Sequence, residues 1–237
     1  MSEISEIREK KPKKTKDEII EIIIIIMLGV TALCTAWASW VGSLHEGNQA
    51  GNYTSSNNVA ADGNSQWNEA AQYLSQDMMI WNTISDLMVE RDFADQAGDT
   101  VAAEKFQWKL DQILYDNVSE DFDLAINWAI EQEAYATPFE MEGYVDSYFA
   151  SAQAVIAESE ELLAKGEQDN KSGDAFGLVT VIYSLVLFLL GIASTFKSTP
   201  NKMVLTIISV AAFALATVYM VTIPLPTGFD LFSFLNP

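Results

Sequence analysis

The stretch Ile22–Leu44, IIIIIMLGVTALCTAWASWVGSL, decides the fold class because its 23 residues include no charged side chain. A helix rises about 1.5 Å per residue, so this run is about 35 Å long, enough to cross a hydrocarbon core of about 30 Å. Two later runs, Phe176–Phe196 and Met203–Ile223, each hold 21 uncharged residues. The sequence therefore predicts an all-α membrane protein with three transmembrane helices.

Basic residues give the expected orientation of these spans. Six lie between Arg8 and Lys16, before the first span, and Lys197 and Lys202 border the short segment between the second and third spans. Lysine and arginine concentrate in cytoplasmic loops. We therefore expect a multi-pass protein of the cell membrane, with a cytoplasmic N-terminus and with residues 45–175 and the C-terminus outside.

The three runs divide the chain into segments. These are a basic cytoplasmic N-terminus (1–21), transmembrane helix 1 (22–44), an acidic helical extracytoplasmic domain (45–175), transmembrane helix 2 (176–196), a cytoplasmic loop (197–202), transmembrane helix 3 (203–223) and an apolar extracytoplasmic tail (224–237). The first span also resembles a cleavable signal peptide, because lysines precede its apolar run and Ala36-Trp37-Ala38 resembles a cleavage site. Because the run continues to Leu44, it is longer than a typical signal core, which favours a retained span.

Nearly all of the net charge of −20 lies in residues 45–175, which contain 26 acidic and five basic residues. Such a domain cannot neutralise phosphates, so we expect no nucleic-acid partner. The charge is expected mainly to keep the domain soluble. Weak divalent-cation binding is the alternative, although the sequence lacks the calcium-loop pattern. Its candidate carboxylates are Glu120, Asp121, Asp123, Glu158, Glu160 and Glu161.

Helical spacing of apolar residues predicts that this acidic domain is an antiparallel helical bundle inserted between spans 1 and 2. A seven-residue repeat on its first helix indicates a buried seam. The candidate seam residues are Tyr53, Trp67, Leu74, Trp81 and Met88. The polar run Asn52–Asn58 leaves two alternatives, a continuous stalk leaving the membrane or a hinge below a helix that begins near Asp62.

Turn-forming residues set the expected boundaries of the other helices. Gly98 is expected to end the first helix, and Asn117–Asp121 to break or kink the next one. Thr137-Pro138 has the pattern that opens a last helix, with proline in its first turn. Gly166 and the polar residues after it are expected to end that helix before the second span.

The sequence contains no recognisable catalytic, cofactor-binding or metal-binding motif. Cys34 is the only cysteine and His45 the only histidine, which excludes zinc and iron–sulfur sites on ligand number. There is neither a glycine-rich phosphate loop nor a GxSxG motif. His45 is expected to form an interfacial polar pair with Glu46. Glycosylation sequons begin at Asn52, Asn117 and Asn170, all of them outside in this topology.

Small and hydroxyl side chains form a stripe on the first span. Such residues let helices approach closely, either within one chain or between subunits. The candidate helix-packing or pore-facing residues are Thr31, Thr35, Ser39 and Gly42.

The stretch Thr35–Trp40 (TAWASW), followed by Gly47–Ala50 (GNQA) and Tyr53, and then Glu69–Gln72 (EAAQ) with Asp77, carries a resemblance to a known family. The chain resembles an uncharacterised prokaryotic family of membrane proteins with one span, a helical loop and two closing spans. The resemblance covers residues 20–90 most clearly and implies a location in a prokaryotic cell membrane. It implies no site residues.

Three classes of function are compatible with this pattern. The leading hypothesis is a non-enzymatic cell-surface scaffold or interaction protein, in contact with membrane lipid, that forms a homo-oligomer through its spans and its helical domain. The first alternative is an oligomeric cation channel with an acidic vestibule and a pore lined by the hydroxyl stripe. The second is an envelope enzyme acting on lipid or peptidoglycan.

Overall fold

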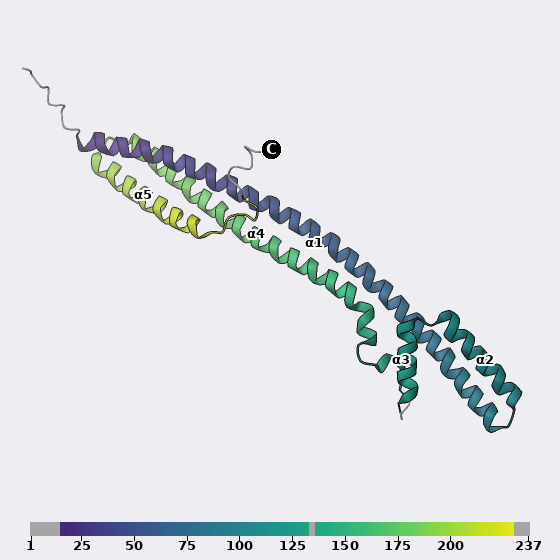
Figure 1. The fold of residues 1–237 in the computed structure, drawn as a ribbon. Coiled ribbons are helices and arrows are strands. Elements are labelled where there is room, and N and C mark those ends of the chain that lie inside the picture. Colours follow the sequence, from purple (N-terminus) through teal and green to yellow (C-terminus); the bar gives the residue numbers. More distant parts are fainter. Residues whose placement is uncertain (1–14, 133–135, 230–237) are drawn as a thin grey trace, which may run out of the picture. The chain divides into compact units, whose positions relative to one another are not determined.

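The structure is a computed structural model that describes residues 15–132 and 136–229 (Figure 1). Its elements in chain order are α1 (Lys16–Gln96), α2 (Thr100–Asn117), α3 (Glu120–Glu131), the 3₁₀ helix η1 (Pro138–Glu140), α4 (Tyr144–Thr195) and α5 (Thr199–Thr222). The described residues include no strand. This confirms the predicted all-α class, and α1, α4 and α5 each contain a stretch long and apolar enough to cross a membrane.

The chain divides into two compact units. Unit 1 consists of Met1–Tyr53 with Ala164–Pro237, and unit 2 is Thr54–Leu163. Helices α1 and α4 contribute to both units, whereas α5 belongs to unit 1 and α2, α3 and η1 belong to unit 2. The acidity is concentrated in unit 2, which has 22 acidic and three basic residues, a net charge of −19.

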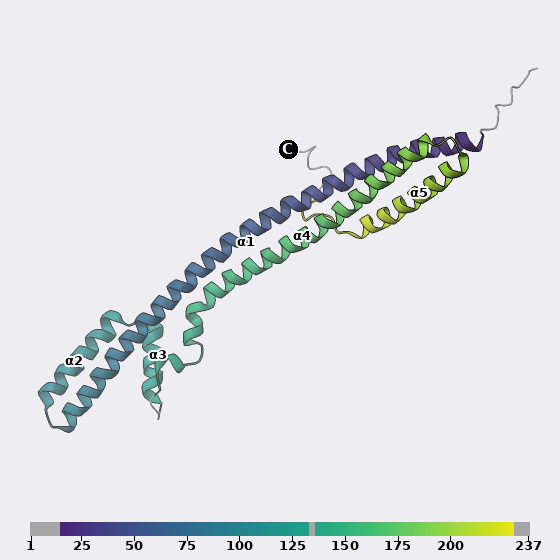
Figure 2. The same ribbon diagram turned by 180° about the vertical axis from the view of Figure 1, so that it is seen from behind.

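Unit 1 consists of three apolar helical segments, from α1, α4 and α5, that lie side by side in both views (Figures 1 and 2). Its core includes Val41 from α1, Tyr183 from α4 and Ala216 from α5, all buried. Large apolar side chains such as Leu33 and Val221 remain exposed on the outer faces. Exposed leucine and valine on charge-free helices are the surface that a lipid bilayer would cover.

Helix α1 is 81 residues long, and local capping interactions define where it begins and where it ends. At its start, the Thr15 backbone N–H donates to Glu18 Oε2 and the Glu18 N–H donates to Thr15 Oγ1, a capping box. At its end, Gly98 takes a φ of 73°, and the Asp99 N–H donates to the carbonyl of Ala94. Between these ends the helix continues unbroken through the polar run after Asn52, as the continuous-stalk alternative predicts.

Helix α4 begins later in the chain than predicted, and it does not end at Gly166 as predicted. Thr137-Pro138 does open a helix, with Thr137 and Glu140 forming a capping box, but it is the short helix η1, and α4 begins only after Gly143, whose φ is 80°. Gly166 does not end the helix, because α4 runs unbroken to Thr195. A glycine inside a helix costs about 1 kcal/mol relative to alanine. Here close packing accounts for it, since a Cβ at Gly166 would lie 2.5 Å from the ring of Tyr53.

Unit 2 surrounds a second apolar core. Helix α2 lies beside the last turns of α1 in both views, and its buried Leu110 packs with Ile84 of α1. Phe122 of α3 stacks on Tyr144 at the start of α4, with ring centroids 5.9 Å apart. Side-chain caps begin both short helices: Asp99 accepts from the Ala102 N–H, and Ser119 from the Phe122 N–H. The break predicted at Asn117–Asp121 therefore separates α2 from α3. The sequence also predicts helix from Phe122 to Ala134, whereas α3 ends at Glu131, and Ala134 lies outside the described residues.

The most buried row of α1 in unit 2 repeats every seven residues, but it contains small and polar side chains. The row is Ser56, Gly63, Ala70, Asp77 and Ile84. The predicted seam residues lie beside this row: Tyr53, Leu74, Trp81 and Met88 are half-buried, and Trp67 is exposed. Small residues take the central row because α4 approaches closely there. A Cβ at Gly63, for example, would lie 2.8 Å from Ile156 Cγ1.

Candidate functional site

The hydroxyl stripe of the first span divides between the interior and the surface of unit 1. Thr31 is fully buried, and its hydroxyl has no hydrogen-bond partner among the described residues. Thr35 is half-buried and donates to the Thr31 carbonyl, while Ser39 is exposed. Gly42 is buried, and a Cβ there would lie 3.3 Å from Phe176 Cβ. Thr31 and Gly42 therefore pack α1 within its own chain, and the stripe does not lie on a single face.

His45 lies in a buried polar cluster that also contains Gln49, Asn52, Asp169 and Asn170, here called the His45 cluster. Its Nδ1 lies 2.7 Å from Asp169 Oδ1, and its Nε2 lies 3.1 Å from the carbonyl oxygen of Pro224. Asn52 donates to the other oxygen of Asp169 at 3.2 Å. Both ring nitrogens face acceptors, and Asp169 is the buried carboxylate partner of the ring.

The histidine therefore pairs with Asp169, whereas the sequence predicts a pair with Glu46. The two partners are 124 positions apart, so local spacing gives no hint of the contact. It depends on the register in which α4 packs against α1. A Ser-His-Asp triad would need a serine hydroxyl at the second ring nitrogen, where this chain has a main-chain carbonyl. The geometry is that of a structural connection between α1, α4 and the segment after α5.

A second buried charge joins α1 to α5. Lys202 is buried, and its Nζ lies 3.1 Å from Asp17 Oδ1 and 2.8 Å from Glu21 Oε1. Asp17 and Glu21 lie one turn apart at the start of α1, so together they hold the ammonium group at the first turn of α5. These contacts place the beginnings of α1 and α5 at the same end of unit 1.

Unit 2 exposes a regular apolar row on α2. Val101, Trp108 and Tyr115 recur every seven residues on the side of the helix opposite its buried Leu110. Their exposed fractions are 77%, 64% and 86%. This row, here called the α2 face, is unusual because the aromatic side chains of small helical domains normally pack inward. Trp108 is therefore at the surface, although a helical domain usually buries its tryptophans.

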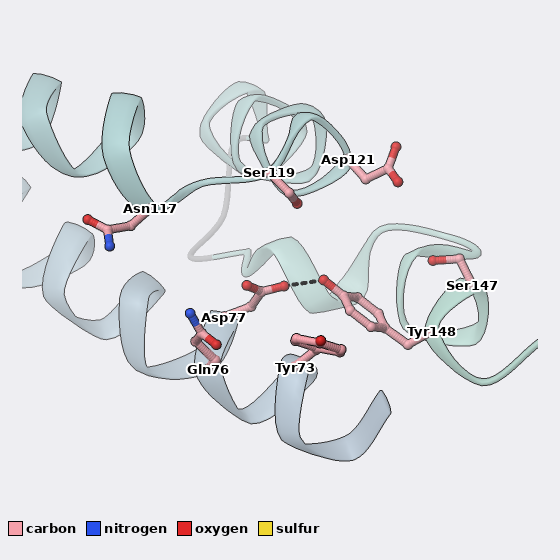
Figure 3. Close-up of a pocket in the computed structure, with 8 residues that line it drawn as sticks. All are labelled: Tyr73, Gln76, Asp77, Asn117, Ser119, Asp121, Ser147 and Tyr148. Carbon is pink, nitrogen blue, oxygen red and sulfur yellow. Dashed lines mark hydrogen bonds between the residues drawn. The ribbon is translucent and has the colours of Figure 1, made fainter. Parts of the chain in front are cut away.

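Unit 2 also contains a cavity of about 450 Å³, here called the Asp77 pocket (Figure 3). Its eight lining residues come from α1, α2, α3 with its N-cap, and α4. They are Tyr73, Gln76, Asp77, Asn117, Ser119, Asp121, Ser147 and Tyr148. The lining is polar, with two carboxylates and no lysine, arginine or histidine.

Asp77 is 8% exposed and accepts two tyrosine hydroxyls on the same oxygen. Tyr144 donates to Oδ2 at 2.7 Å, and Tyr148 donates to the same atom. Burial, together with the hydrogen bond to Asp77, raises the pKa of Tyr148 to about 12. Burial, followed by hydrogen bonds with Tyr148 and Asp77, raises the pKa of Tyr144 above its ordinary value. Both hydroxyls therefore remain donors at neutral pH, and Asp77 acts as their acceptor.

Within the described residues, no group of three or more acidic, histidine or cysteine side chains is arranged to hold a metal ion. The sequons are placed differently from one another. Asn52 and Asn170 lie inside helices, with their side chains in the His45 cluster, whereas Asn117 is exposed at the end of α2 and lines the Asp77 pocket.

No family model matches the chain, and neither the curated proteins nor the solved structures compared with it include a match. The resemblance to a prokaryotic three-span family therefore stays a prediction. Three features of the described residues bear on function: the α2 face, the His45 cluster and the Asp77 pocket.

Proposed function

We propose that this chain is a non-enzymatic membrane protein that carries unit 2 as a helical bundle outside the cell and self-associates through the α2 face. The observation that carries the proposal is the exposed row Val101, Trp108 and Tyr115 on a charged helix. Exposed aromatic side chains on a soluble domain mark interaction surfaces, because they gain most when covered.

The topology of the proposal is supported by charge and by the contacts of Lys202. The basic residues before α1 and Lys197 after α4 favour the cytoplasm. Lys202 contacts Asp17 and Glu21, so the two segments predicted to be cytoplasmic belong to one end of unit 1. The acidic unit 2, with a net charge of −19, has the composition of a solvated domain.

The surface available for self-association differs from the one that the sequence predicts. The small-residue seam of α1 is covered by α4 of the same chain, as the Ser56 hydroxyl bond to the Ser159 carbonyl illustrates. The seam is therefore not free for a second copy. The α2 face has the seven-residue spacing of a helix–helix interface and has no covering helix among the described residues.

The charge distribution of unit 2 supports a second copy as the occupant of the α2 face, because the basic residues gather around α2 and the rest of the unit is acidic. All three basic residues of unit 2 lie on α2 or contact it: Lys105, Lys109 and Arg91, which donates to Gln107. When two copies of α2 pair antiparallel about a two-fold axis at Trp108, residues of the α2 face equidistant from the axis meet. Val101 of each copy then faces Tyr115 of the other.

Disulfide crosslinking tests this register directly. In a chain with Cys34→Ala, we expect Trp108→Cys to form a covalent dimer under mild oxidation in detergent. The control, Leu124→Cys, is comparably exposed on α3 and should remain monomeric. Light scattering should also give a discrete oligomer for the unmodified chain, and higher salt should strengthen it by screening the repulsion between the acidic units.

Substitutions give the complementary result. Trp108→Ala with Tyr115→Ala should shift the oligomer to monomer, and Lys105→Asp should weaken it because it adds a negative charge beside the α2 face. The proposal is abandoned if the unmodified chain is monomeric across several detergents. Equally efficient crosslinking of the Leu124→Cys and Trp108→Cys chains would also overturn the assigned face.

A further inference from the structure

We propose that the Asp77 pocket binds a linear aliphatic diamine, with one ammonium group at Asp77 and the other at Asp121. This binding site is independent of the α2 face, because none of the residues that line the pocket belongs to the row Val101, Trp108 and Tyr115. The two proposals can therefore fail separately.

Asp77 is a buried carboxylate that no lysine, arginine or histidine of the described residues contacts. Buried carboxylates are normally paired with a cation, because their removal from water is costly. Asp77 has only the neutral hydroxyls of Tyr144 and Tyr148, both on Oδ2. No hydrogen bond or ion pair to its Oδ1 is present among the described residues. A ligand cation in the cavity would supply the missing charge.

The three basic side chains of unit 2 do not line this cavity. Arg91 donates to Asp92 and Gln107, and Lys109 lies over the ring of Phe106. Lys105 is on α2, outside the set of residues that line the pocket. The unit therefore has an excess of carboxylates and leaves the one buried in its pocket without a protein counter-ion.

Asp121 provides a second carboxylate at the same cavity. Figure 3 shows Asp77 on the α1 side of the cavity and Asp121 across from it, near Ser119 and the start of α3. Two separated carboxylates match two separated ammonium groups. The amide groups of Gln76 and Asn117 and the hydroxyls of Ser119 and Ser147 supply further acceptors for N–H donors.

Two aromatic side chains of the cavity are placed to contact the methylene groups of a diamine. Tyr73 and Tyr148 both line the cavity, and an aromatic ring can contact methylene groups on its face and attract an adjacent ammonium group. A volume of about 450 Å³ lies within the range of small-molecule sites.

Other ligand classes fit this lining less well. A calcium ion requires six to eight converging oxygens, and no group of three acidic side chains converges among the described residues. An amino acid or another zwitterion would bring a carboxylate that no basic lining residue could bind. A neutral sugar would leave both carboxylates uncompensated. A quaternary ammonium ion has no N–H group to donate to Asp77.

Calorimetry with 1,4-diaminobutane tests the inference on the purified full chain in detergent at physiological salt. We expect saturable binding with one site per chain. Asp77→Asn should weaken it about tenfold, because a buried charge-assisted contact is lost. Asp121→Asn should weaken it several-fold, and butylamine, with one ammonium group, should bind about tenfold less tightly than the diamine.

The matched control is Asp123→Asn, which removes the same charge from the same helix two residues away and does not line the cavity. It should leave the affinity unchanged. Asp121 is exposed, so its variant tests the site even if Asp77→Asn proves unstable by circular dichroism. The inference is overturned by an absence of saturable heat, by an Asp123→Asn effect as large as that of Asp121→Asn, or by displacement of the diamine with equimolar magnesium.

Discussion

Asp169 in unit 1 and Asp77 in unit 2 are two buried carboxylates with different surroundings. Their exposed fractions are 6% and 8%. Asp169 contacts the imidazole of His45 and the amide of Asn52, which use both of its oxygens. Asp77 receives two neutral hydroxyls on one oxygen and borders a cavity. The difference indicates that the first carboxylate holds helices together, whereas the second is available to a ligand.

The largest expected effect comes from Asp169→Ala, which removes the paired carboxylate. His45 Nδ1 and the Asn52 amide would then lose their partner. Each buried polar group left without a hydrogen-bond partner costs about 1–3 kcal/mol, and this substitution leaves two such groups. We expect a loss of this size in the free energy of unfolding, measured by denaturant titration of the full chain in detergent.

Asp174→Ala is the control for that substitution, because Asp174 lies on the same helix and is exposed. It should change the free energy of unfolding by no more than about 0.5 kcal/mol. Equal effects of the two substitutions would show that Asp169 contributes only as one more surface charge and would remove the distinction from Asp77.

A smaller loss is expected from Gly166→Ala, because Gly166 sets how closely α4 approaches α1 one turn before Asp169. The new Cβ would lie 2.5 Å from two ring carbons of Tyr53. Overpacking of this kind costs about 1–3 kcal/mol. The same substitution at Gly51, where nothing lies within 4 Å of a new Cβ, should instead stabilise the helix by up to about 1 kcal/mol. Thermal unfolding of the two variants compares them directly.

Tyr53→Ala in the same chain provides the second test of that contact. If steric overlap with the ring causes the loss, Gly166→Ala should cost less in the Tyr53→Ala background than alone. An unchanged cost would mean that the helices shift apart for another reason.

The sequence predicted the helices better than their partners. The uncharged run Ile22–Leu44 and the stop at Gly98 depend on local chemistry, and both are recognisable without the fold. The pairing of His45 with Asp169 is not local, because it requires the register of two long antiparallel helices. The sequence therefore predicted polar residues just after the first span, but not which of them contact one another.

The central row of α1 was missed for a related physical reason. Pattern recognition weights large apolar residues, so Trp67 and Trp81 marked the seam. In the structure the central positions are the small or polar ones, Gly63 and Asp77 among them, because the helices approach too closely for large side chains. The seven-residue repeat does predict a buried row on α1, but the large apolar residues point to the row beside it. The Asp77 pocket itself needs α1, α2, α3 and α4 together, and no single motif encodes that combination.

The smallest expected effect is a change in stability of unit 2 at alkaline pH, and it follows from the hydrogen bonds of Asp77. The pKa of Tyr148 is raised from 10.0 to about 12, by burial first and then by its bond to Asp77. A group with a raised folded-state pKa stabilises the fold below its unfolded pKa. That stabilisation is then lost as the pH rises from about 10 to about 12. We expect unfolding to become easier across this interval.

Tyrosinate absorbance during a pH titration separates this effect from general alkaline unfolding. Tyr148→Phe should remove the step near pH 12, and Asp77→Asn should move that step to lower pH because the neighbouring negative charge is gone. His45 and Asp169 lie in unit 1, so Asp169→Asn should leave the step unchanged. A step that moves equally with Asp77→Asn and Asp169→Asn would contradict the difference between the two carboxylates, because it would report loss of the whole fold and not the local bond.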